Sequence, residues 1–353
     1  MRLKVLFGAL GYTYRKWDIP MSDCTFDYEV LQSKQIPYYN FEKITFTHSG
    51  LYPVVAKENP LVIITNAFSL ATIKLWCRSW FVSTPYIIWS GAIRGNKRES
   101  SFLRNLQRKI LTKRAAGFVA YGTRAKEYLV SLGADPNKIE IGINTVDIDF
   151  FINETKTLRS ITTLSKNKKH LLYIGHLTKG KRIDQLLLSI KILSKKRGDF
   201  VVQLVGDGPE MEHLKMLSKQ LNIEEFVRFE GFKQKPEIPK YLSSADCFLF
   251  PSEYDVWGLV LVEAMAAGVP CIASIHAGAT FDLIKDEMNG FVMDFSATEK
   301  VAERINWILD NPEKSKEIGR NASSFIEENV SLQKSAEGFM RAIERTLEKM
   351  AFS

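Results

Sequence analysis

The residues of this chain best placed to do chemistry are two acids, Asp255 and Glu263, within the segment 251–270. The apolar run after Gly258 predicts a helix that ends at Gly268, because glycine commonly follows the last helical residue. Glu263 then lies mid-helix among apolar neighbours, where a lone charge is costly unless something pairs with it. The free N–H groups at the start of this helix attract anions such as phosphates. A carboxylate for hydroxyl groups beside a helix end for phosphates is suited to a nucleotide sugar.

Two acids separated by seven residues and followed by Ala-Met-Ala-Ala-Gly-Val-Pro resemble the E-x7-E signature of the retaining glycosyltransferases of family 4. Glu263 matches the second glutamate, and Asp255 replaces the first. The resemblance implies that Glu263 binds the ribose hydroxyls of a nucleotide and that Asp255 approaches the donor sugar or its leaving phosphate. The alternative is a buried glutamate held by a neighbouring arginine or backbone group, with Asp255 as a helix N-terminal charge. The backbone N–H groups expected to face the phosphates belong to Trp257, Gly258, Leu259 and Val260.

A second stretch, Tyr173-Ile-Gly-His-Leu-Thr-Lys-Gly-Lys-Arg-Ile-Asp184, resembles the phosphate loop of the same family. By register Lys181 matches the family's lysine, His176 stands in place of its arginine, and Arg182 replaces the following glycine. The resemblance implies that Lys181 and His176 stabilise the departing diphosphate electrostatically. His176 supplies charge only when it is protonated, and otherwise it donates a neutral hydrogen bond. Lys179 or Arg182 are alternative sources of the missing charge, and a solvated basic turn is the structural alternative.

Three weaker matches complete the expected donor side. The segment Gly206-Asp-Gly-Pro209 resembles a loop in which glycines let the backbone turn tightly and approach a ligand. The segment Phe229-Glu-Gly-Phe-Lys233 resembles the nucleobase loop, which implies base recognition by the backbone of Phe232 and Lys233. Gly278 is the one glycine retained where the family often has a glycine pair near the donor sugar.

The expected acceptor side offers fewer signals. Gly8 and Gly11 follow the first predicted strand, where the family carries a glycine turn that touches the diphosphate and the acceptor. Trp89, Ser90 and Glu99 lie beyond a later strand. Glu99 either orients an acceptor hydroxyl or balances its basic neighbours.

Length and patterning predict an α/β protein with two domains. The 353 residues, 45% hydrophobic and 25% charged, describe an ordinary globular protein with an ample core. Strand-like runs separated by helical stretches predict doubly wound parallel sheets, and the resemblance implies the GT-B architecture, in which two Rossmann-like domains face each other across a cleft. The expected parts are an acceptor-side domain over 1–152, a polar linker over 153–169, a nucleotide-sugar-binding domain over 170–335 and a final helix over 336–353 that packs back on the first domain.

The net charge of +8 is concentrated between Arg94 and Arg114, where eight lysines and arginines accompany the single acid Glu99. The segment 101–115 has helical periodicity, with an apolar stripe beside a basic face. Such a helix either docks on an anionic membrane surface or packs on the core with a solvated outer face. No nucleic-acid-binding motif accompanies the charge, so nucleic acid is not an expected partner. The apolar stripe consists of Phe102, Leu103, Leu106, Ile110 and Leu111.

No metal and no bound cofactor are expected. The four cysteines lack metal or redox spacing, and no Asp-x-Asp pair lies near the donor loops. No run approaches the roughly 20 apolar residues of a membrane-spanning helix, and the first residues lack the layout of a signal peptide. The expected location is therefore cytoplasmic, with a peripheral position on the inner face of the cell membrane as a further possibility.

Together these signals favour a retaining, metal-independent glycosyltransferase of the hexosyltransferase type. Its donor would be a nucleotide-diphosphate sugar, and its acceptor a hydroxyl of a glycan or lipid-linked molecule in cell-surface polysaccharide or glycoconjugate assembly. One alternative is a non-hydrolysing sugar-nucleotide epimerase, which requires an acid/base set that the sequence does not reveal. The other is a catalytically weak nucleotide-sugar-binding protein of the same fold, indicated by the substitutions at His176 and Asp255.

Overall fold

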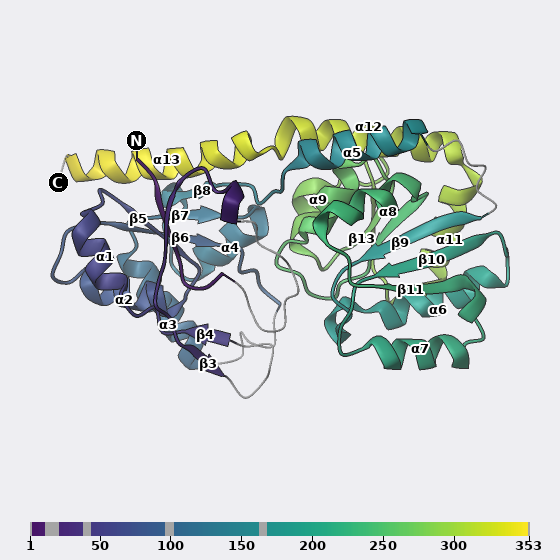
Figure 1. The fold of residues 1–353 in the computed structure, drawn as a ribbon, viewed down its shortest axis with the longest axis horizontal. Coiled ribbons are helices and arrows are strands. Elements are labelled where there is room, and N and C mark those ends of the chain that lie inside the picture. The colour runs from purple at the N-terminus through teal and green to yellow at the C-terminus, as the bar shows by residue number, and fades with distance from the viewer. Residues whose placement is uncertain (1, 11–20, 38–43, 96–101, 162–167, 352–353) are drawn as a thin grey trace.

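The chain folds into two α/β lobes that lie side by side (Figure 1). The amino-terminal half forms most of the first lobe and the carboxyl-terminal half forms the second. Gly11 and Glu99, both expected site residues, lie outside the described parts of the chain. The computed structural model describes residues 2–10, 21–37, 44–95, 102–161 and 168–351.

The elements of the first lobe are β1 (Lys4–Phe7), β2 (Asp27–Val30), β3 (Gln35–Pro37), β4 (Ile44–Phe46), α1 (Leu51–Glu58), β5 (Ile63–Asn66), α2 (Leu70–Arg78), β6 (Tyr86–Ser90), α3 (Phe102–Arg114), β7 (Gly117–Ala120), α4 (Thr123–Ser131) and β8 (Ile139–Ile141). Strands β5, β6, β7 and β8 form a parallel sheet in that order. Successive residues of a strand point to opposite faces, and both Ile87 and Ile88 of β6 are fully buried. The sheet is therefore covered on both sides, as parallel sheets usually are.

The elements of the second lobe are β9 (Lys169–Ile174), α6 (Ile183–Ser194), β10 (Phe200–Val205), α7 (Met211–Gln220), β11 (Val227–Gly231), α8 (Ile238–Ser244), β12 (Cys247–Phe250), α9 (Leu259–Ala266), β13 (Cys271–Ser274), α10 (Gly278–Leu283), β14 (Phe291–Met293), α11 (Thr298–Asp310) and α12 (Pro312–Asn329). The six strands form one parallel sheet in the order β11-β10-β9-β12-β13-β14. The strand order reverses between β9 and β12. In open α/β sheets, ligands bind beside such a reversal, at the carboxyl ends of the strands.

Residues 153–161 correct the expectation of an irregular polar linker. They belong to α5 (Ile148–Ile161), whose Phe151 and Thr155 are buried. Arg159 donates hydrogen bonds to the carbonyl oxygens of Leu242 and Ala267, at 3.4 and 2.7 Å, which tie the helix to the second lobe. The exposed face of α5 is polar enough to hide its helical period, and residues 162–167 lie outside the described ranges.

The last helix, α13 (Leu332–Ala351), crosses to the first lobe and lies along its sheet (Figure 1). Ala342 and Ile343 are buried against Ile87 of β6 and Val119 of β7. Glu140 of β8 pairs with two arginines of this helix, Arg341 at 3.1 Å and Arg345 at 2.8 Å. The second lobe is thus tied to the first by its own final helix. Within the described ranges, no helix has both the length and the apolar character needed to cross a membrane.

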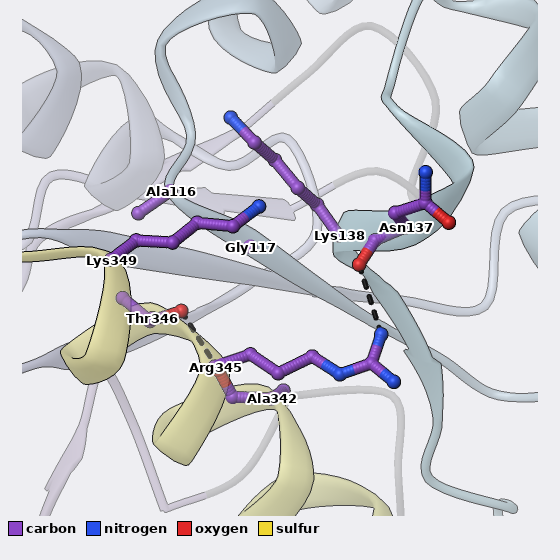
Figure 2. Close-up of a pocket in the computed structure, with 8 residues that line it drawn as sticks. All are labelled: Ala116, Gly117, Asn137, Lys138, Ala342, Arg345, Thr346 and Lys349. Atoms are coloured by element: carbon purple, nitrogen blue, oxygen red, sulfur yellow. Dashed lines mark hydrogen bonds between the residues drawn. The ribbon is translucent and has the colours of Figure 1, made fainter.

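A small pocket lies at this helix contact (Figure 2). Ala116 and Gly117 lie at the start of β7, and Asn137 and Lys138 precede β8, so the pocket is at the amino ends of the strands. Figure 2 shows Arg345 reaching the carbonyl oxygen of Asn137, with which it forms a 3.0 Å hydrogen bond. Ligands of parallel sheets bind at the opposite edge. The pocket is therefore separate from the site expected from the sequence.

Candidate functional site

The loops after β9 and β12 meet at the strand-order reversal of the second sheet. β9 and β12 are paired neighbours, so their carboxyl-terminal loops are adjacent. The backbone N–H of Glu253 donates a 2.9 Å hydrogen bond to the carbonyl oxygen of Gly180 and joins the two loops. Lys181 on the first loop then forms an ion pair with Asp255 on the second. The two side chains are only 22% and 17% exposed, so two residues 74 positions apart share one protected site.

The segment 251–258, called the donor loop below, holds Asp255 in place. The backbone N–H of Trp257 donates to the Asp255 carboxylate at 3.3 Å, and the N–H of Gly278 donates to the Asp255 carbonyl oxygen at 2.9 Å. Gly258 has a φ of 103°, and a β-carbon there would lie 2.4 Å from the ring of Phe250. Only glycine fits this turn. The Trp257 N–H, expected to face a phosphate, is taken by Asp255 in this structure.

Helix α9 begins at Leu259, directly after that turn, with Val260 as its second residue. Both belong to the first turn of the helix, whose N–H groups have no partner further up the helix. Leu259 is 38% exposed, so this helix end is close to solvent.

Glu263 lies on α9 between buried apolar residues and is itself only partly exposed. Burial raises the pKa of Glu263 to about 7, and the charge of Lys235 opposes this shift. In the described ranges, no donor forms a hydrogen bond to its carboxylate. The alternative of a structural glutamate held by a neighbouring arginine therefore lacks support. Glu263 is therefore a costly acid that no described residue pairs by a hydrogen bond, which makes it a candidate for a functional site.

The expected cations of the β9 loop have different environments. His176 is 48% exposed, and its Nδ1 lies 3.7 Å from a carboxylate oxygen of Asp207. Arg182 adopts a φ of 51°, the left-handed conformation for which the family pattern uses glycine. Its guanidinium faces Glu253 and Asp184, each at 3.4 Å.

The glycines of the donor side have packing roles. A β-carbon on Gly206, whose φ is 140°, would lie 1.9 Å from the carbonyl oxygen of Gly175. The backbone at Gly206 therefore packs closely against the loop that follows β9. Likewise, a β-carbon on Gly278 would lie 2.3 Å from the carbonyl oxygen of Val256, so Gly278 keeps α10 against the donor loop. Phe232 and Lys233 follow β11 and are partly exposed.

The acceptor-side residues that the structure describes are mostly packing residues. Gly8 ends β1 against the imidazole of His48, which a β-carbon on Gly8 would approach to 2.6 Å. Trp89 packs on the ring of Tyr121, with ring centroids 5.2 Å apart. The Ser90 side chain is buried, and its hydroxyl oxygen accepts from a neighbouring backbone N–H. Trp89 and Ser90 belong to β6, which corrects the expectation that they lie beyond this strand. Their place on the acceptor side stays a prediction.

Three residues beside the site escaped the sequence analysis. Lys235, on the short 3₁₀ turn Lys235–Glu237, is the cation whose charge acts on Glu263. Thr123 and Asp282 form a hydrogen bond between the two lobes, with their side-chain oxygens 2.5 Å apart. No pattern in the sequence links these two residues, which are 159 positions apart.

In the part of the chain that the structure describes, no group of three His, Cys, Asp or Glu side chains could hold a metal ion.

Comparisons with known proteins agree with this architecture. Residues 154–325 match the sequence model of the family described as Glycosyl transferases group 1. An uncharacterized glycosyltransferase of Haemophilus influenzae is 34% identical over 43% of this chain and 44% of its own length. The N-acetyl-alpha-D-glucosaminyl L-malate synthase of Bacillus anthracis is 31% identical over 56% of this chain and 52% of its own length. The chain thus spans about half the length of these two relatives.

A solved structure extends the similarity to nearly the whole chain. The structure of HepE from Anabaena in complex with UDP has a TM-score of 0.73 to this protein, with 19% sequence identity. The similarity covers 90% of this chain and 86% of HepE. It shows the fold, and it confirms the expected GT-B class of two α/β domains with parallel sheets.

We expect the Glu263→Gln substitution to stabilise the protein at alkaline pH only. The pKa of Glu263 is about 7 in the folded protein, against an ordinary value of 4.5. The unfolded chain therefore ionises first, and Glu263 costs the folded state stability as pH rises from 4.5 to 7. Removing this cost should raise the free energy of unfolding by about 3 kcal/mol near pH 8, and by almost nothing near pH 4. Urea unfolding at both pH values measures this difference.

The matched control is the exposed glutamate Glu328 on α12, changed to glutamine. It should leave the free energy of unfolding nearly unchanged at both pH values. An equal effect of both substitutions at alkaline pH would contradict the burial of the Glu263 charge.

Proposed function

We propose that the protein is a retaining, metal-independent glycosyltransferase, on the premise that residues 154–325, which match the sequence model of Glycosyl transferases group 1, form a domain of that family. It moves a sugar from a nucleotide-diphosphate sugar to a hydroxyl of a glycan or lipid-linked acceptor. The observation that carries this proposal is the ion pair of Lys181 and Asp255 at the reversal of the strand order, directly before the helix that carries Glu263. UDP, which is bound in the HepE structure, is the first nucleotide to consider.

Lys181 is proposed to stabilise the leaving diphosphate. Its ammonium is paired with Asp255 and lies 5.7 Å from the centre of the Phe250 ring, in a site with little solvent exposure. Electrostatic interactions are stronger in such surroundings than in bulk water. A diphosphate oxygen would compete with Asp255 for this cation. Asp255 is then free to accept a hydrogen bond from the donor sugar.

Glu263 is proposed to bind the ribose of the nucleotide. An ionised carboxylate accepts hydrogen bonds from two neighbouring hydroxyl groups, which supplies the partners that the protein itself leaves missing. Because the pKa of Glu263 is about 7, this carboxylate ionises as pH rises through neutrality. Nucleotide binding should strengthen over the same range.

His176 is proposed as a second contact to the diphosphate. It is half-exposed, on the same loop as Lys181, and its Nδ1 lies 3.7 Å from a carboxylate oxygen of Asp207. Arg182, the other candidate for this role, already forms ion pairs with Asp184 and Glu253. His176 is therefore the better candidate for the role that arginine fills in the family pattern.

The transfer itself needs no covalent enzyme intermediate. The acceptor oxygen forms a bond to the anomeric carbon on the face from which the diphosphate departs. The bond between that carbon and the phosphate oxygen breaks, and the acceptor proton passes to the leaving phosphate oxygen. Configuration at the anomeric carbon is retained. No step of this scheme requires a metal.

A thermal-shift panel with UDP, GDP, ADP, dTDP and CMP, with and without their common sugars, tests the donor site. One nucleotide should stabilise the protein, by about 2.7 kcal/mol at a ligand concentration 100 times Kd. Glu263→Ala should abolish most of this stabilisation. Glu253→Ala, at an exposed acid of the donor loop, is the matched control and should retain it. No stabilisation by any nucleotide would contradict the donor site.

Lys181→Ala should reduce turnover far more than donor affinity. Loss of one preorganised group that stabilises transition-state charge commonly lowers kcat by about 100-fold or more. Lys195→Ala removes an exposed lysine at the carboxyl end of α6 and should change kcat by less than about two-fold. Radiolabelled sugar transfer from the donor found above measures both. Donor binding without any transfer by the unmodified protein would favour the nucleotide-sugar-binding alternative.

We further propose that α3 docks the enzyme on an anionic bilayer, on the inner face of the cell membrane, where lipid-linked acceptors are found. The apolar stripe expected on this helix is mostly exposed: only Leu111 is buried, while Phe102 is 78% and Leu103 75% exposed. Lys109 and Lys113 are exposed beside it. Exposed large apolar side chains next to cations suit a negatively charged membrane surface.

Fewer basic side chains of α3 are available for membrane contact than the sequence suggests. Arg108 bonds the hydroxyl of Tyr128 and lies 5.4 Å from the centre of the Phe68 ring. Arg114 lies 4.0 Å from the centre of the Trp80 ring and bonds Ser79. These two arginines stabilise the fold, so they are unsuitable for testing membrane contact.

The double substitution Phe102→Ser and Leu103→Ser should weaken binding to vesicles of phosphatidylcholine and phosphatidylglycerol by at least about ten-fold, because it removes two large side chains from the bilayer contact. Leu61→Ser, at a residue that is 76% exposed elsewhere on the lobe, is the matched control. Vesicle co-sedimentation measures both. Equal binding of the two variants, or equal binding to vesicles without phosphatidylglycerol, would contradict this docking surface.

A further inference from the structure

The first lobe contacts the donor loop on both sides of Asp255. Tyr254 packs against the hydrophobic core of the first lobe. Trp257 is only 3% exposed, and a β-carbon on Gly122 of the first lobe would lie 2.4 Å from its ring. The candidate catalytic carboxylate thus sits between two aromatic residues that are held by the opposite lobe.

A carboxylate of the second lobe caps a helix of the first. Asp282 accepts hydrogen bonds from the backbone N–H of Thr123, at 3.0 Å, and from its hydroxyl, at 2.5 Å. Thr123 is the first residue of α4, and the preceding Gly122 has no side chain with which to cap the helix. A carboxylate at a helix N-terminus is favourable both as a hydrogen-bond acceptor and as a negative charge near the positive end of the helix dipole.

The contact between the two lobes requires glycine at position 122. Its φ is −177°, an extended conformation open to any residue. A β-carbon there, however, would lie 2.4 Å from the Asp282 carboxylate and 2.4 Å from the Trp257 ring. The missing side chain is therefore a requirement for docking the two lobes.

The same carboxylate is connected to the donor loop through α10. At the start of α10, the N–H of Gly278 donates to the carbonyl oxygen of Asp255, and the N–H of Ala279 donates to that of Trp257 at 3.2 Å. Asp282 lies on this short helix. Any shift of α10 relative to α4 is therefore transmitted to the backbone of Asp255.

We propose that Asp282 is a positioning residue, whose contact with Thr123 docks the lobes and sets Asp255 and Lys181 for sugar transfer. This inference rests on the proposed function. Nucleotide binding by Glu263 and the second lobe does not require the contact, whereas transfer requires the acceptor-side lobe in place. Loss of the contact should therefore lower kcat and leave donor affinity almost unchanged.

Three variants test the contact in different ways. Asp282→Ala removes the cap, Thr123→Val removes the hydroxyl donor, and Gly122→Ala inserts one methyl group between the lobes. Each should lower kcat on the order of 10- to 100-fold, as expected for misplaced reacting groups, with less than about two-fold change in donor affinity. The matched control is Asp135→Asn, since Asp135 caps a short helix wholly within the first lobe by accepting from the N–H of Asn137 at 2.9 Å. It should leave kcat unchanged.

A double-mutant cycle separates the contact from unrelated structural damage. If Asp282 and Thr123 act through one contact, the double variant should be no slower than the slower single variant. Fully multiplicative losses in kcat, or donor affinity that falls as much as kcat, would overturn the proposal.

Amide hydrogen exchange gives a readout that is independent of activity. Asp282→Ala should accelerate exchange at residues 123–126 in the first lobe and at 254–258 in the second. Faster exchange confined to α10 would overturn the docking role. If the unmodified protein neither binds nucleotides nor transfers sugar, the proposed function fails, while hydrogen exchange still decides whether Asp282 docks the lobes. If it binds and transfers but the variants match it, the positioning role alone fails.

Discussion

The ion pair between Lys181 and Asp255 is the interaction on which the rest of the site depends. It exists because β9 and β12 are neighbours at the point where the strand order reverses, which places the loops that follow them side by side. Each charge would be costly alone in this poorly solvated position, and pairing offsets part of that cost. The same pairing keeps a cation next to the end of α9, where a phosphate group is favoured.

The two carboxylates of the motif lie in opposite electrostatic surroundings. Asp255 is neutralised by Lys181 and held by the N–H of Trp257. Glu263 is surrounded by apolar residues, and burial moves its pKa close to neutrality. Environments that differ in this way assign different tasks to chemically similar groups. Asp255 is ready to exchange one ionic partner for another, whereas Glu263 needs hydroxyl donors that the protein does not provide.

The sequence was sufficient for features with strong local patterns. The strands around Ile87 and Val119 and the helix carrying Glu263 follow from apolar runs bounded by glycine. Sequence analysis was insufficient where contacts between distant segments determine the structure. The exposed face of α5 concealed a helix over residues 153–161, and the stripe around Phe102 has a helical period although it faces solvent. Periodicity shows that residues share a face of a helix, but it does not show what that face contacts.

Contacts between distant segments were the least accessible to sequence analysis. Gly206 and Gly278 were expected near a ligand, because a glycine that admits a ligand and a glycine that admits another loop look the same in sequence. Their neighbours are the backbones of the β9 loop and the donor loop. The capping of Thr123 by Asp282 has no sequence signal, because a threonine at a helix start normally supplies its own cap.

The placement of the connections between the lobes gives the Thr123–Asp282 contact its importance. The chain passes between the lobes just before α5 and again between α12 and α13, and these helices run along one edge of the molecule (Figure 1). Arg159 fixes α5 to the second lobe, and Glu140 fixes α13 to the first. A rotation of one lobe against the other about this edge leaves the attachments made by Arg159 and Glu140 intact. It changes the contacts that lie away from the edge. The hydrogen bonds of Asp282 and the packing of Trp257 are such contacts, so lobe movement and the position of Asp255 are mechanically linked.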